Sequence, residues 1–504
     1  MKNDKTIRTR FAPSPTGYLH IGGLRTALYA YLFAKKNGGK FILRLEDTDQ
    51  NRLVEGADKV IYDALKDAGL NYDEGPDTGG DFGPYIQSER KEIYQKYADE
   101  LIKKGGAYYC FCDGKSNNND SDVITKYNKI CLSLTPAQIK QNLKNKKPFV
   151  IRQNIPAVGT TAYTDLVFGE IIIENKELED NVLIKSDGLP TYNFANVVDD
   201  RLMGITHVMR GVEYLSSTPK YNHIYDAFGW DKPQYVHLQN IMKDTNQKLS
   251  KRHGAASYED FIKKGFIKEG ILNYIALLGW SPKGEEEKFS LEELVNRFNI
   301  EGLSKSPAIF DEVKMRYINS LHIKDMSAEE FHKQAMSFYD KVFYCSAEDT
   351  QGGISSVIMK KTDGGTLKGT SFADDIDLIY LSMLLHSRIE IFSDIIDLTK
   401  FIFNFDNYDL SNFDNEKMKT DRTAAKEILP KLMDFLENED WDNIGGLLGE
   451  FSDKEGYKKG QVMWVFRIAL TGAKNTPGGA SEMAKLFGKN IGIDRLKKSI
   501  GYLA

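Results

Sequence analysis

Polar and apolar residues follow one another along the first third of the chain in a pattern that predicts alternating strands and helices. Residues 6–12 alternate polar and apolar side chains, as a half-buried strand does. A break rich in proline and glycine follows, and from Gly22 onward apolar residues recur at helical spacing. A second strand is expected over residues 40–45 and a second helix over residues 54–68. This order and spacing predict an α/β fold with a parallel, doubly wound sheet.

The rest of the chain shows two further patterns. Between about residues 86 and 196 the strand–helix alternation loosens, and this region is interpreted as an insertion, with strand-like apolar runs at 171–173 and 182–184. After about residue 325 the sequence is typical of helices. Residues 349–369 are rich in Gly, Ser, Thr and Lys, and we expect them to form a flexible excursion within that helical part.

Composition narrows the class of protein. The 504 residues exceed one ordinary hydrophobic core, and 41% apolar with 28% charged residues exclude a disordered chain, a collagen and a coiled-coil rod. No stretch approaches the roughly 20 apolar residues of a membrane span, and the N-terminus lacks the apolar core of a signal peptide. With only four cysteines, we expect a reducing, cytoplasmic location and no disulfide scaffold.

The charge balance limits the partners that fit. The 67 basic and 72 acidic side chains leave a formal charge of −5, whereas proteins that coat nucleic acid without selectivity are far more basic. An RNA partner would therefore have to bind a local basic face, and the acidic surface elsewhere would limit non-specific binding.

The first chemical signal lies at the start of the first predicted helix, in Tyr18-Leu19-His20-Ile21-Gly22-Gly23. A helix N-terminus presents unpaired N–H groups and the positive end of the helix dipole, which attract phosphate. The glycines let a nucleotide approach the backbone, and the His20 imidazole can donate to phosphate oxygens. Taken alone, the pattern has a structural alternative of similar weight, a helix start capped by a histidine.

The second signal is the basic run Gln247-Lys248-Leu249-Ser250-Lys251-Arg252-His253-Gly254. Two lysines that flank a serine on a loop can neutralise the charge that develops on a leaving pyrophosphate. An isolated run of this kind is usually a solvated basic loop. Because both signals occur in one chain and in this order, they favour a nucleotide site.

This pair resembles the HIGH and KMSKS signatures of class I aminoacyl-tRNA synthetases, and the surrounding residues are similar to the glutamyl-tRNA synthetase branch of that family. The similar blocks run in family order through roughly the first 320 residues and continue more weakly toward the C-terminus. They are Arg10-Phe11-Ala12-Pro13-Ser14-Pro15-Thr16-Gly17, Leu45-Glu46-Asp47-Thr48-Asp49, Gly83-Pro84-Tyr85-Ile86-Gln87-Ser88, residues 187–200, Thr206-His207-Val208-Met209-Arg210-Gly211 and residues 272–280, 460–464 and 467–472.

The resemblance implies a division into five parts. A Rossmann-like catalytic domain would be split into residues 1–85 and 197–255, the second half carrying the KMSKS-like loop. A connective insertion at 86–196 would lie between the halves and bind the acceptor end of tRNA. A stem-contact domain would follow at 256–325, and then a mostly helical anticodon-binding region at 326–504, in two subdomains that meet near residue 410.

A glutamate pocket needs two cations for the two carboxylates and an accepting group for the ammonium, and guanidinium groups suit carboxylates best. By resemblance, the pocket has two cations, two neutral hydrogen-bonding groups and two groups that hold the ammonium, which are Arg10 and Arg210, Tyr192 and Asn196, and Glu46 and Ser14, respectively. The sequence leaves open which arginine holds which carboxylate. A glutamine pocket needs no second cation, so Arg210 favours glutamate.

The reaction implied by the resemblance has two steps. The glutamate α-carboxylate attacks the α-phosphorus of ATP and releases diphosphate, and the 2′-hydroxyl of the terminal adenosine of tRNA then attacks the glutamyl-adenylate. Such chemistry depends on positioning and electrostatics more than on proton transfer. His20, Lys248 and Lys251, with Mg²⁺, would stabilise the reacting phosphate. The residues implied to contact ATP are His20, Gly22, Gly23, Leu249, Ser250 and Lys251.

The implied partners are glutamate, ATP and tRNA(Glu), with the tRNA bound before activation becomes efficient. The sequence leaves open whether tRNA(Gln) is charged as well. By resemblance we expect a monomer, and we expect no membrane contact. Arg388, on a predicted helix, is a candidate for anticodon contact, against the alternative of an exposed helix arginine.

The cysteines raise the question of a metal. Some relatives hold zinc in the insertion through a Cys-x-Cys pair and a later Cys/His pair. Here Cys110, Cys112 and Cys131 are present, but Ser133 stands where a fourth ligand is wanted, and structural zinc normally takes four N or S ligands. Small buried thiols are therefore favoured over a zinc site.

Three alternatives fit parts of this pattern. They are an enzyme that glutamylates a modified tRNA base, a nucleotidylyltransferase with a HIGH-like fold, and a non-catalytic RNA-binding descendant of a synthetase. The length of the chain argues against the first, and the pocket residues argue against the second. The third is disfavoured because the residues for chemistry are all present, namely His20, Lys251, Glu46 and Arg210.

Overall fold

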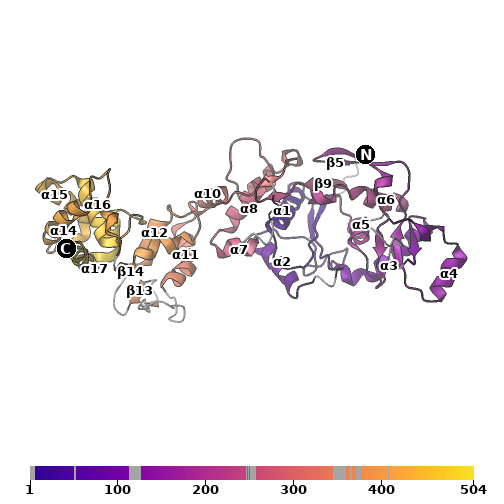
Figure 1. The fold of residues 1–504 in the computed structure, drawn as a ribbon, viewed down its shortest axis with the longest axis horizontal. Helices are drawn as coiled ribbons and strands as arrows, with labels where there is room; N and C mark the ends of the chain where they lie inside the picture. The colour runs from indigo at the N-terminus through magenta and orange to yellow at the C-terminus, as the bar shows by residue number, and fades with distance from the viewer. Residues whose placement is uncertain are drawn as a thin grey trace, which may run out of the picture. The chain divides into compact units, whose positions relative to one another are not determined.

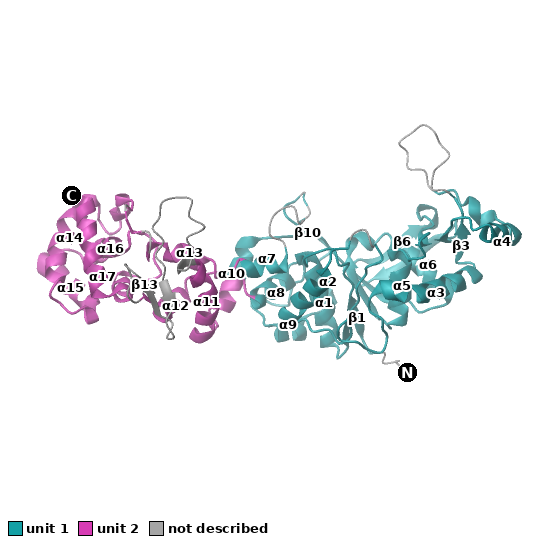
Figure 2. Cartoon of the chain, turned by 90° about the horizontal axis from the view of Figure 1, so that it is seen from below, with its two compact units in different colours: residues 1–263, 268–318 teal, residues 264–267, 319–504 magenta. Residues whose placement is uncertain are grey.

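The computed structural model describes residues 6–49, 53–112, 127–245, 247, 249, 257–343, 359–361, 366–369, 376–402, 405–406 and 408–504. The elements of the chain follow one another as labelled in Figure 1. Contacts divide the chain into two compact units, shown in different colours in Figure 2, with residues 1–263 and 268–318 in unit 1 and residues 264–267 and 319–504 in unit 2. Among the described helices, none is long and apolar enough to cross a bilayer.

The predicted strand–helix–strand–helix start is confirmed in unit 1. Strands β1 (Arg8–Phe11) and β2 (Lys40–Leu43) are parallel, α1 (Ile21–Lys36) connects them, and α2 (Ala57–Asp67) follows. Helix α1 buries Leu24, Leu28 and Leu32 completely. These leucines recur every four residues, so one stripe of the helix packs on the strands.

A second group of strands continues this layer. Four strands pair in the order β6-β5-β9-β8, with bounds β5 (Thr160–Asp165), β6 (Gly169–Glu174), β8 (His207–Gly211) and β9 (Gln234–Leu238). β8 and β5 are parallel to β9, and β6 is antiparallel to β5. β1 lies beside β8, where the Thr206 N–H donates to the Arg8 carbonyl at 2.9 Å. The carboxyl ends of β1 and β8 therefore meet at one edge, the usual place for a ligand in such sheets.

The region predicted as an insertion has a sheet of its own. β3 (Ala107–Cys110), β4 (Val150–Gln153) and β7 (Val182–Ile184) pair antiparallel, alongside α3 (Lys91–Lys103) and α4 (Pro136–Lys144). The β5–β6 hairpin falls in the same residue range but pairs with β9 of the larger sheet. The sequence does not reveal this, because the hairpin has the alternation of any half-buried strand pair. The division into five functional parts stays a prediction.

The remaining elements of unit 1 are mostly short helices. They are α5 (Tyr192–Leu202), α6 (Thr218–Phe228), β10 (Ile241–Met242), α7 (Tyr258–Lys263), α8 (Lys268–Leu277), α9 (Leu291–Arg297), β11 (Ala308–Ile309) and α10 (Glu312–Ile323), whose last turn passes into unit 2. α5 is the next element after β7 and packs on α6, where the Tyr221 hydroxyl donates to Asn193 Oδ1 at 3.2 Å.

Unit 2 is mainly helical, as the pattern after residue 325 predicts. Its helices are α11 (Ala328–Phe343), α12 (Leu378–Leu385), α13 (Asp394–Thr399), α14 (Arg422–Leu436), α15 (Ile444–Glu455), α16 (Lys459–Thr471) and α17 (Ala480–Leu503). α17 packs on α14, α15 and α16 and is broken at Gly488, where φ is 70°. Three short antiparallel strands, β12 (Met359–Lys361), β13 (Thr366–Gly369) and β14 (Ile376–Asp377), are the described part near the predicted excursion at 349–369, and the rest of it lies outside the described residues.

Candidate active site

A chain of alternating charges fixes the first predicted arginine. Arg10 on β1 is 3% exposed; its Nε donates to Asp200 Oδ1 at 3.0 Å and its Nη1 donates to the Met209 carbonyl at 3.1 Å. Asp200 also accepts from Arg44 Nη1 at 2.7 Å, and Arg44 Nη2 donates to Glu46 at 2.9 Å. Arg10 and Glu46 are therefore held as one unit by two buried residues that lie between them.

The protonation of this chain follows from burial and charge. Burial acts to raise the pKa of Asp200, but Arg10 and Arg44 outweigh it and hold that pKa below its usual value. For Glu46, burial prevails over Arg44 and Arg10, and the pKa is raised. Glu46 is thus a carboxylate whose negative charge is incompletely compensated, which suits it to accept an ammonium group. Its N–H donates to the Pro13 carbonyl at 3.0 Å, so the loop that carries the exposed Ser14 lies beside it.

The second predicted arginine has different surroundings. Arg210 on β8 is 5% exposed; its Nε donates to His237 Nε2 at 3.2 Å and its Nη2 donates to Thr218 Oγ1 at 2.7 Å. The guanidinium carbon lies 5.2, 4.9 and 5.6 Å from the ring centres of Tyr214, Tyr221 and Tyr235, respectively. Among the described residues, none forms a carboxylate ion pair with Arg210. An arginine has five N–H donors, so this buried cation keeps donors available for an anion.

Helix α5 supplies the neutral groups. Tyr192 opens the helix, and its ring centre is 5.0 Å from that of Tyr214. Asn196, 2% exposed, lies one turn later and its amide donates to the Tyr192 carbonyl. Burial raises the pKa of Tyr192, while the charges of Arg210 and Arg10 lower it and that of Glu46 raises it. All of these charges act on one hydroxyl, so the structure brings together five of the six predicted pocket residues, with Ser14 on the adjoining loop.

The start of α1 is built as the sequence predicts. His20 is the N-cap residue, and its Nδ1 accepts the Gly22 N–H at 3.1 Å. The neutral ring then carries its proton on Nε2, the atom that could donate to a phosphate oxygen. A side chain at Gly23 would approach Leu19 to 3.3 Å and Phe11 to 3.8 Å, so glycine keeps this first turn close to β1. The capping role and the ligand role of His20 are therefore compatible.

The basic loop is described only in part. Lys248, Ser250 and Lys251 lie outside the described residues. Between Lys248 and Ser250, the Leu249 N–H donates to the Ile241 carbonyl at 3.0 Å. After them, Ser257 forms a β-bridge with His20, next to a bond from the Tyr258 N–H to the Leu19 carbonyl at 3.1 Å. The end of the predicted lysine loop is thus anchored at the start of α1.

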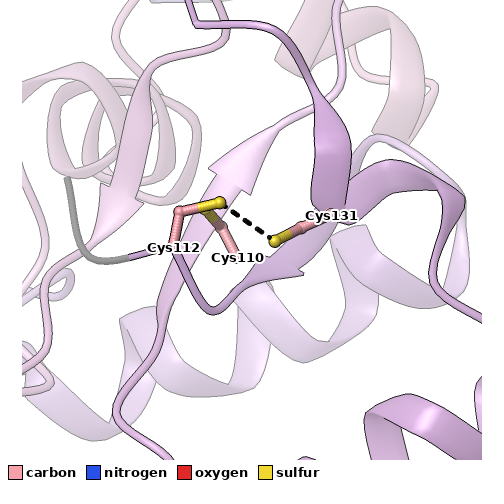
Figure 3. A group of neighbouring side chains, drawn as sticks. All are labelled: Cys110, Cys112 and Cys131. Carbon is pink, nitrogen blue, oxygen red and sulfur yellow. Dashed lines mark hydrogen bonds between the residues drawn. The ribbon is translucent and has the colours of Figure 1, made fainter. Parts of the chain in front are cut away.

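The three cysteines of the insertion gather at one point, shown in Figure 3. Their sulfur atoms lie within 4.8 Å of one another, and the Cys112 and Cys131 sulfurs are 3.3 Å apart. Cys110 and Cys131 are buried, as expected, whereas Cys112 is exposed. The Tyr127 hydroxyl is 3.1 Å from the Cys110 sulfur and 3.7 Å from that of Cys112. The sequence did not single out Tyr127, and its spacing four positions before Cys131 gives no familiar signal.

In unit 2, Arg388 follows the last turn of α12 and is exposed, with its N–H bonded to the Leu385 carbonyl at 2.8 Å. Its charge, together with the larger effect of burial, lowers the pKa of Arg467. Arg467 lies 4.7 Å above the Trp464 ring. Arg388 therefore belongs to a small basic and aromatic group with Arg467 and Trp464.

Several residues of the site have roles that the sequence did not reveal. Arg44 interrupts the apolar run Phe41-Ile42-Leu43, and Asp199 and Asp200 follow the buried run Phe194–Val198 of α5. A charged residue within or next to a buried run requires a partner. The position of these three charges was therefore the sequence signal from which buried ion pairs could have been predicted. His237 and Thr218 carry no such signal, because a lone histidine or threonine is common in any core.

Two family comparisons cover most of the chain. Residues 6–317 match the family described as tRNA synthetases class I (E and Q), catalytic domain, and residues 330–500 match the anticodon binding domain family. The first match ends close to the boundary between the two compact units.

Individual relatives agree with this assignment. The chain is 51% identical to the glutamate–tRNA ligase of Clostridium botulinum over 99% of both chains, and 49% identical to that of Clostridium novyi over 98% of this chain and 99% of the relative. Its fold is similar to the crystal structure of a glutamate tRNA ligase from Elizabethkingia meningosepticum in complex with its amino acid, with a TM-score of 0.82 and 31% identity over 99% of this chain and 100% of that one. The chain with the paired arginines, the tyrosine cluster and the capped first helix belongs to the class I tRNA synthetases of the glutamate and glutamine group.

Proposed function

We propose that this protein is a glutamate–tRNA ligase that uses ATP to join L-glutamate to the 3′ end of tRNA(Glu) through a glutamyl-adenylate. The observation that carries the choice of amino acid is Arg210, a buried guanidinium with no described carboxylate partner. A buried, unpaired charge costs several kcal/mol, and the side-chain carboxylate of glutamate would compensate it. The neutral amide of glutamine would not.

The surroundings of the two arginines support an orientation for the substrate. Arg10 already shares Asp200 with Arg44 and lies in the unit that contains Glu46, next to the Ser14 loop. The ammonium and α-carboxylate end of glutamate would lie there. Arg210, within the tyrosine cluster and near Tyr192, would bind the side-chain carboxylate, with Asn196 adding a hydrogen bond. Planar guanidinium donors match a carboxylate in two-point contacts.

The nucleotide would lie at the start of α1. The Gly23 N–H of the first turn and the Nε2 proton of His20 would face phosphate oxygens, while the Gly22 N–H is bonded to His20 Nδ1. Lys248 and Lys251, with Leu249 and Ser250 between them, would neutralise the departing diphosphate, and Mg²⁺ would supply further positive charge there. This chemistry follows the electrostatic logic of phosphoryl transfer. The 2′-hydroxyl of the terminal adenosine would then attack the adenylate.

The proposal is tested by ATP–diphosphate exchange with glutamate, measured with and without tRNA(Glu), and with glutamine as the matched control. We expect glutamate-dependent exchange that requires tRNA, and no exchange with glutamine. Exchange with glutamine alone, or none under any condition, contradicts the proposal. Charging of purified tRNA(Glu) and tRNA(Gln), each supplied separately, then decides whether the enzyme, which we take to be a cytoplasmic monomer, acts on one tRNA or both.

The thiol cluster supports a structural zinc ion in the insertion. Three cysteine sulfurs within 4.8 Å suit a tetrahedral site, and the Tyr127 hydroxyl or an outside ligand would take the fourth position. The Phe111 N–H donates to the Cys131 sulfur at 3.3 Å and Arg152 Nε to the Cys110 sulfur at 3.4 Å, contacts that suit thiolates. Zinc would connect Cys110 and Cys112, at the end of β3, to Cys131.

Metal analysis tests this part. The purified protein should contain about one zinc per chain, and Cys112→Ser should contain far less, since structural zinc normally needs four ligands. The matched control is the fourth cysteine, Cys345, which lies outside the described residues; Cys345→Ser should keep the zinc. Equal, negligible zinc in all three proteins means that the cluster is a group of reduced thiols.

A further inference from the structure

Asp165 is a buried carboxylate whose hydrogen bonds are fully accounted for. It ends strand β5 and is 1% exposed. Its Oδ1 accepts the N–H groups of Val167 and Phe168, both at 2.9 Å. Its Oδ2 accepts the His237 N–H at 3.1 Å and the ring Nδ1–H of His237 at 2.7 Å. Four N–H donors converge on the two oxygens, so a carboxylate fits this position and a protonated acid does not.

This arrangement fixes the tautomer of His237. With the ring proton on Nδ1, Nε2 has a lone pair, and Arg210 Nε donates to it at 3.2 Å. The Thr218 oxygen, 3.3 Å from Nε2, accepts from Arg210 Nη2 at 2.7 Å and donates its own proton to the Tyr214 carbonyl at 2.8 Å. One edge of the Arg210 guanidinium is therefore bonded to two acceptors, and the orientation of each acceptor is fixed by its own hydrogen bond to Asp165 or to the Tyr214 carbonyl.

We propose that Asp165 and His237 are positioning residues that aim the free edge of Arg210 at the side-chain carboxylate of the amino acid substrate. The proposal rests on the role of Arg210 given under the proposed function. Asp165 sets the His237 tautomer, His237 and Thr218 hold one edge of the guanidinium, and the remaining donors face the pocket. Neither Asp165 nor His237 contacts the substrate in this arrangement, so they act through Arg210 alone.

The mechanism requires His237 to be neutral. A protonated ring would present Nε2–H to Arg210 Nε–H, placing two donors and two positive charges together. Burial, the largest cause, lowers the pKa of His237, as does Arg210, while Asp165 and Glu213 raise it. These are the charged groups that face the ring, from the ends of β5 and β8 and the turn after β8. The neutral form is thus kept at ordinary pH, and the acceptor is lost only in acid.

Asp165→Asn provides the first test. An amide NH₂ facing His237 would favour the other tautomer, with a proton on Nε2 opposite Arg210. We expect the KM for glutamate to rise roughly tenfold or more, because a hydrogen bond to a charged group is disturbed. The KM values for ATP and tRNA should stay within about twofold. Asp180→Asn is the matched control, since Asp180 is also buried and accepts N–H and O–H bonds, from Ile155 and Tyr108.

A pair of substitutions at His237 separates positioning from packing. His237→Gln keeps a donor for Asp165 and an acceptor for Arg210 at similar spacing, whereas His237→Leu keeps only volume. The glutamine variant should retain a glutamate KM within about threefold of the wild type, and the leucine variant should lose at least tenfold. His223→Gln is the control, because His223 bonds Thr161 and does not touch Arg210. This pair decides the question even when Asp165→Asn does not fold.

The pH profile gives a readout that loss of packing would not move. In the wild type, kcat/KM for glutamate should fall in acid through titration of His237 and of the shared pocket carboxylate Glu46. His237→Gln should retain only the Glu46 part, so its acid limb should be shallower. Identical limbs, or equal KM values in the glutamine and leucine variants, overturn the positioning role. Arg210→Ala distinguishes the two proposals: an unchanged glutamate KM there removes the proposed pocket itself, whereas a raised KM there with normal Asp165→Asn kinetics removes only this inference.

Discussion

Arg210 in unit 1 and Arg495 in unit 2 are both buried guanidinium groups without a carboxylate ion pair among the described residues, but their surroundings differ. Arg495, 1% exposed, donates to the backbone carbonyls of Phe401, Leu470 and Ile402 at 3.2, 2.8 and 2.7 Å. It lies against the rings of Phe405 and Phe487, 4.4 and 4.0 Å from their centres. Arg210 instead bonds the side chains of His237, Thr218 and Tyr192 and is surrounded by tyrosines.

The difference shows what each cation is for. Burial lowers the pKa of Arg495, because its phenylalanine surroundings offer little compensation. Burial also acts to lower the pKa of Arg210, but the tyrosine oxygens of Tyr192, Tyr221 and Tyr235 outweigh it and the pKa is raised. Arg495 ties together three backbone positions and is closed off by apolar rings, so it stabilises the fold. Arg210 lies among polar groups with donors remaining, so it can recognise an anion.

The largest expected effect is on catalysis. Arg210→Ala should lower kcat/KM for glutamate by 100-fold or more, about 3 kcal/mol, because a charge-assisted two-point contact is lost. The thermal midpoint should change little, since no internal ion pair is broken. Arg210→Lys keeps the charge without the planar donors and should fall between the two. Steady-state kinetics with varied glutamate checks this, and wild-type values for Arg210→Ala would place the arginine outside the pocket.

The second-largest effect is on stability, and it is the reverse of the effect expected at Arg210. Arg495→Met should destabilise unit 2 by about 2–3 kcal/mol, because three buried carbonyls lose their donor. The KM for glutamate should not change. Thermal unfolding followed by circular dichroism, together with glutamate kinetics on the same sample, measures both quantities. A stable variant with a raised glutamate KM would mean that the two arginines have been assigned the wrong way round.

A third buried arginine, Arg8, forms an ion pair with a carboxylate, which is the ordinary arrangement for a buried arginine. Breaking this pair should have a smaller effect on stability. Arg8 donates through two nitrogens to Glu74, each at 2.8 Å. Burial acts to raise the pKa of Glu74, but Arg8, Tyr85 and Lys40 lower it to about 2 from its ordinary 4.5. The carboxylate therefore stabilises the fold fully above pH 4.5, and this contribution is lost as the pH falls toward 2.

Glu74→Gln tests that arrangement. It should lower the stability at neutral pH by about 1–2 kcal/mol and should flatten the acid loss of stability between pH 4.5 and 2. Unfolding by urea at a series of pH values measures the effect. A variant with the acid loss of the wild type would show that other carboxylates dominate there. The Glu74→Gln substitution should not alter which amino acid the enzyme selects.

The smallest expected effect is at the surface of unit 2. Arg388→Ala should raise the KM for tRNA(Glu) about threefold to fivefold, the loss of one basic contact with RNA. The KM values for glutamate and ATP should be unchanged. Lys426→Ala, at another exposed position of unit 2, is the control. Equal tRNA kinetics in the two variants would mean that Arg388 is an ordinary exposed arginine.

Much of the first sheet could be predicted from local patterns. The four-residue recurrence of leucines in α1 reports burial directly, and both this helix and strand β1 form where expected. The alternation in residues 6–12 predicts a half-buried strand, and in this respect it is wrong, because β1 is buried at all four positions and Arg8 and Arg10 form ion pairs there. The start of α1 carries its own signal in His20, Gly22 and Gly23. These features depend on neighbours within a few positions, which is what periodicity can measure.

The supporting contacts of the pocket could not be predicted in the same way. Arg10 and Asp200 are separated by 190 positions, and His237 and Asp165 by 72. Such partners are chosen by the packing of strands and helices from different parts of the chain, and no local pattern records it. The resemblance to a family supplied the residues that would touch the substrate. The structure adds the residues that hold them.

Helix α5 carries Tyr192, Asn196 and Asp200 at successive turns, so the hydrogen bonds proposed for the substrate and the counter-charge of Arg10 depend on the phase of a single helix. One added or deleted residue between Tyr192 and Asp200 would rotate the following positions by about 100° and would separate these groups. The same length change in the loop before Thr191 would leave their mutual phase intact. Natural insertions and deletions should therefore be tolerated ahead of this helix and absent within it.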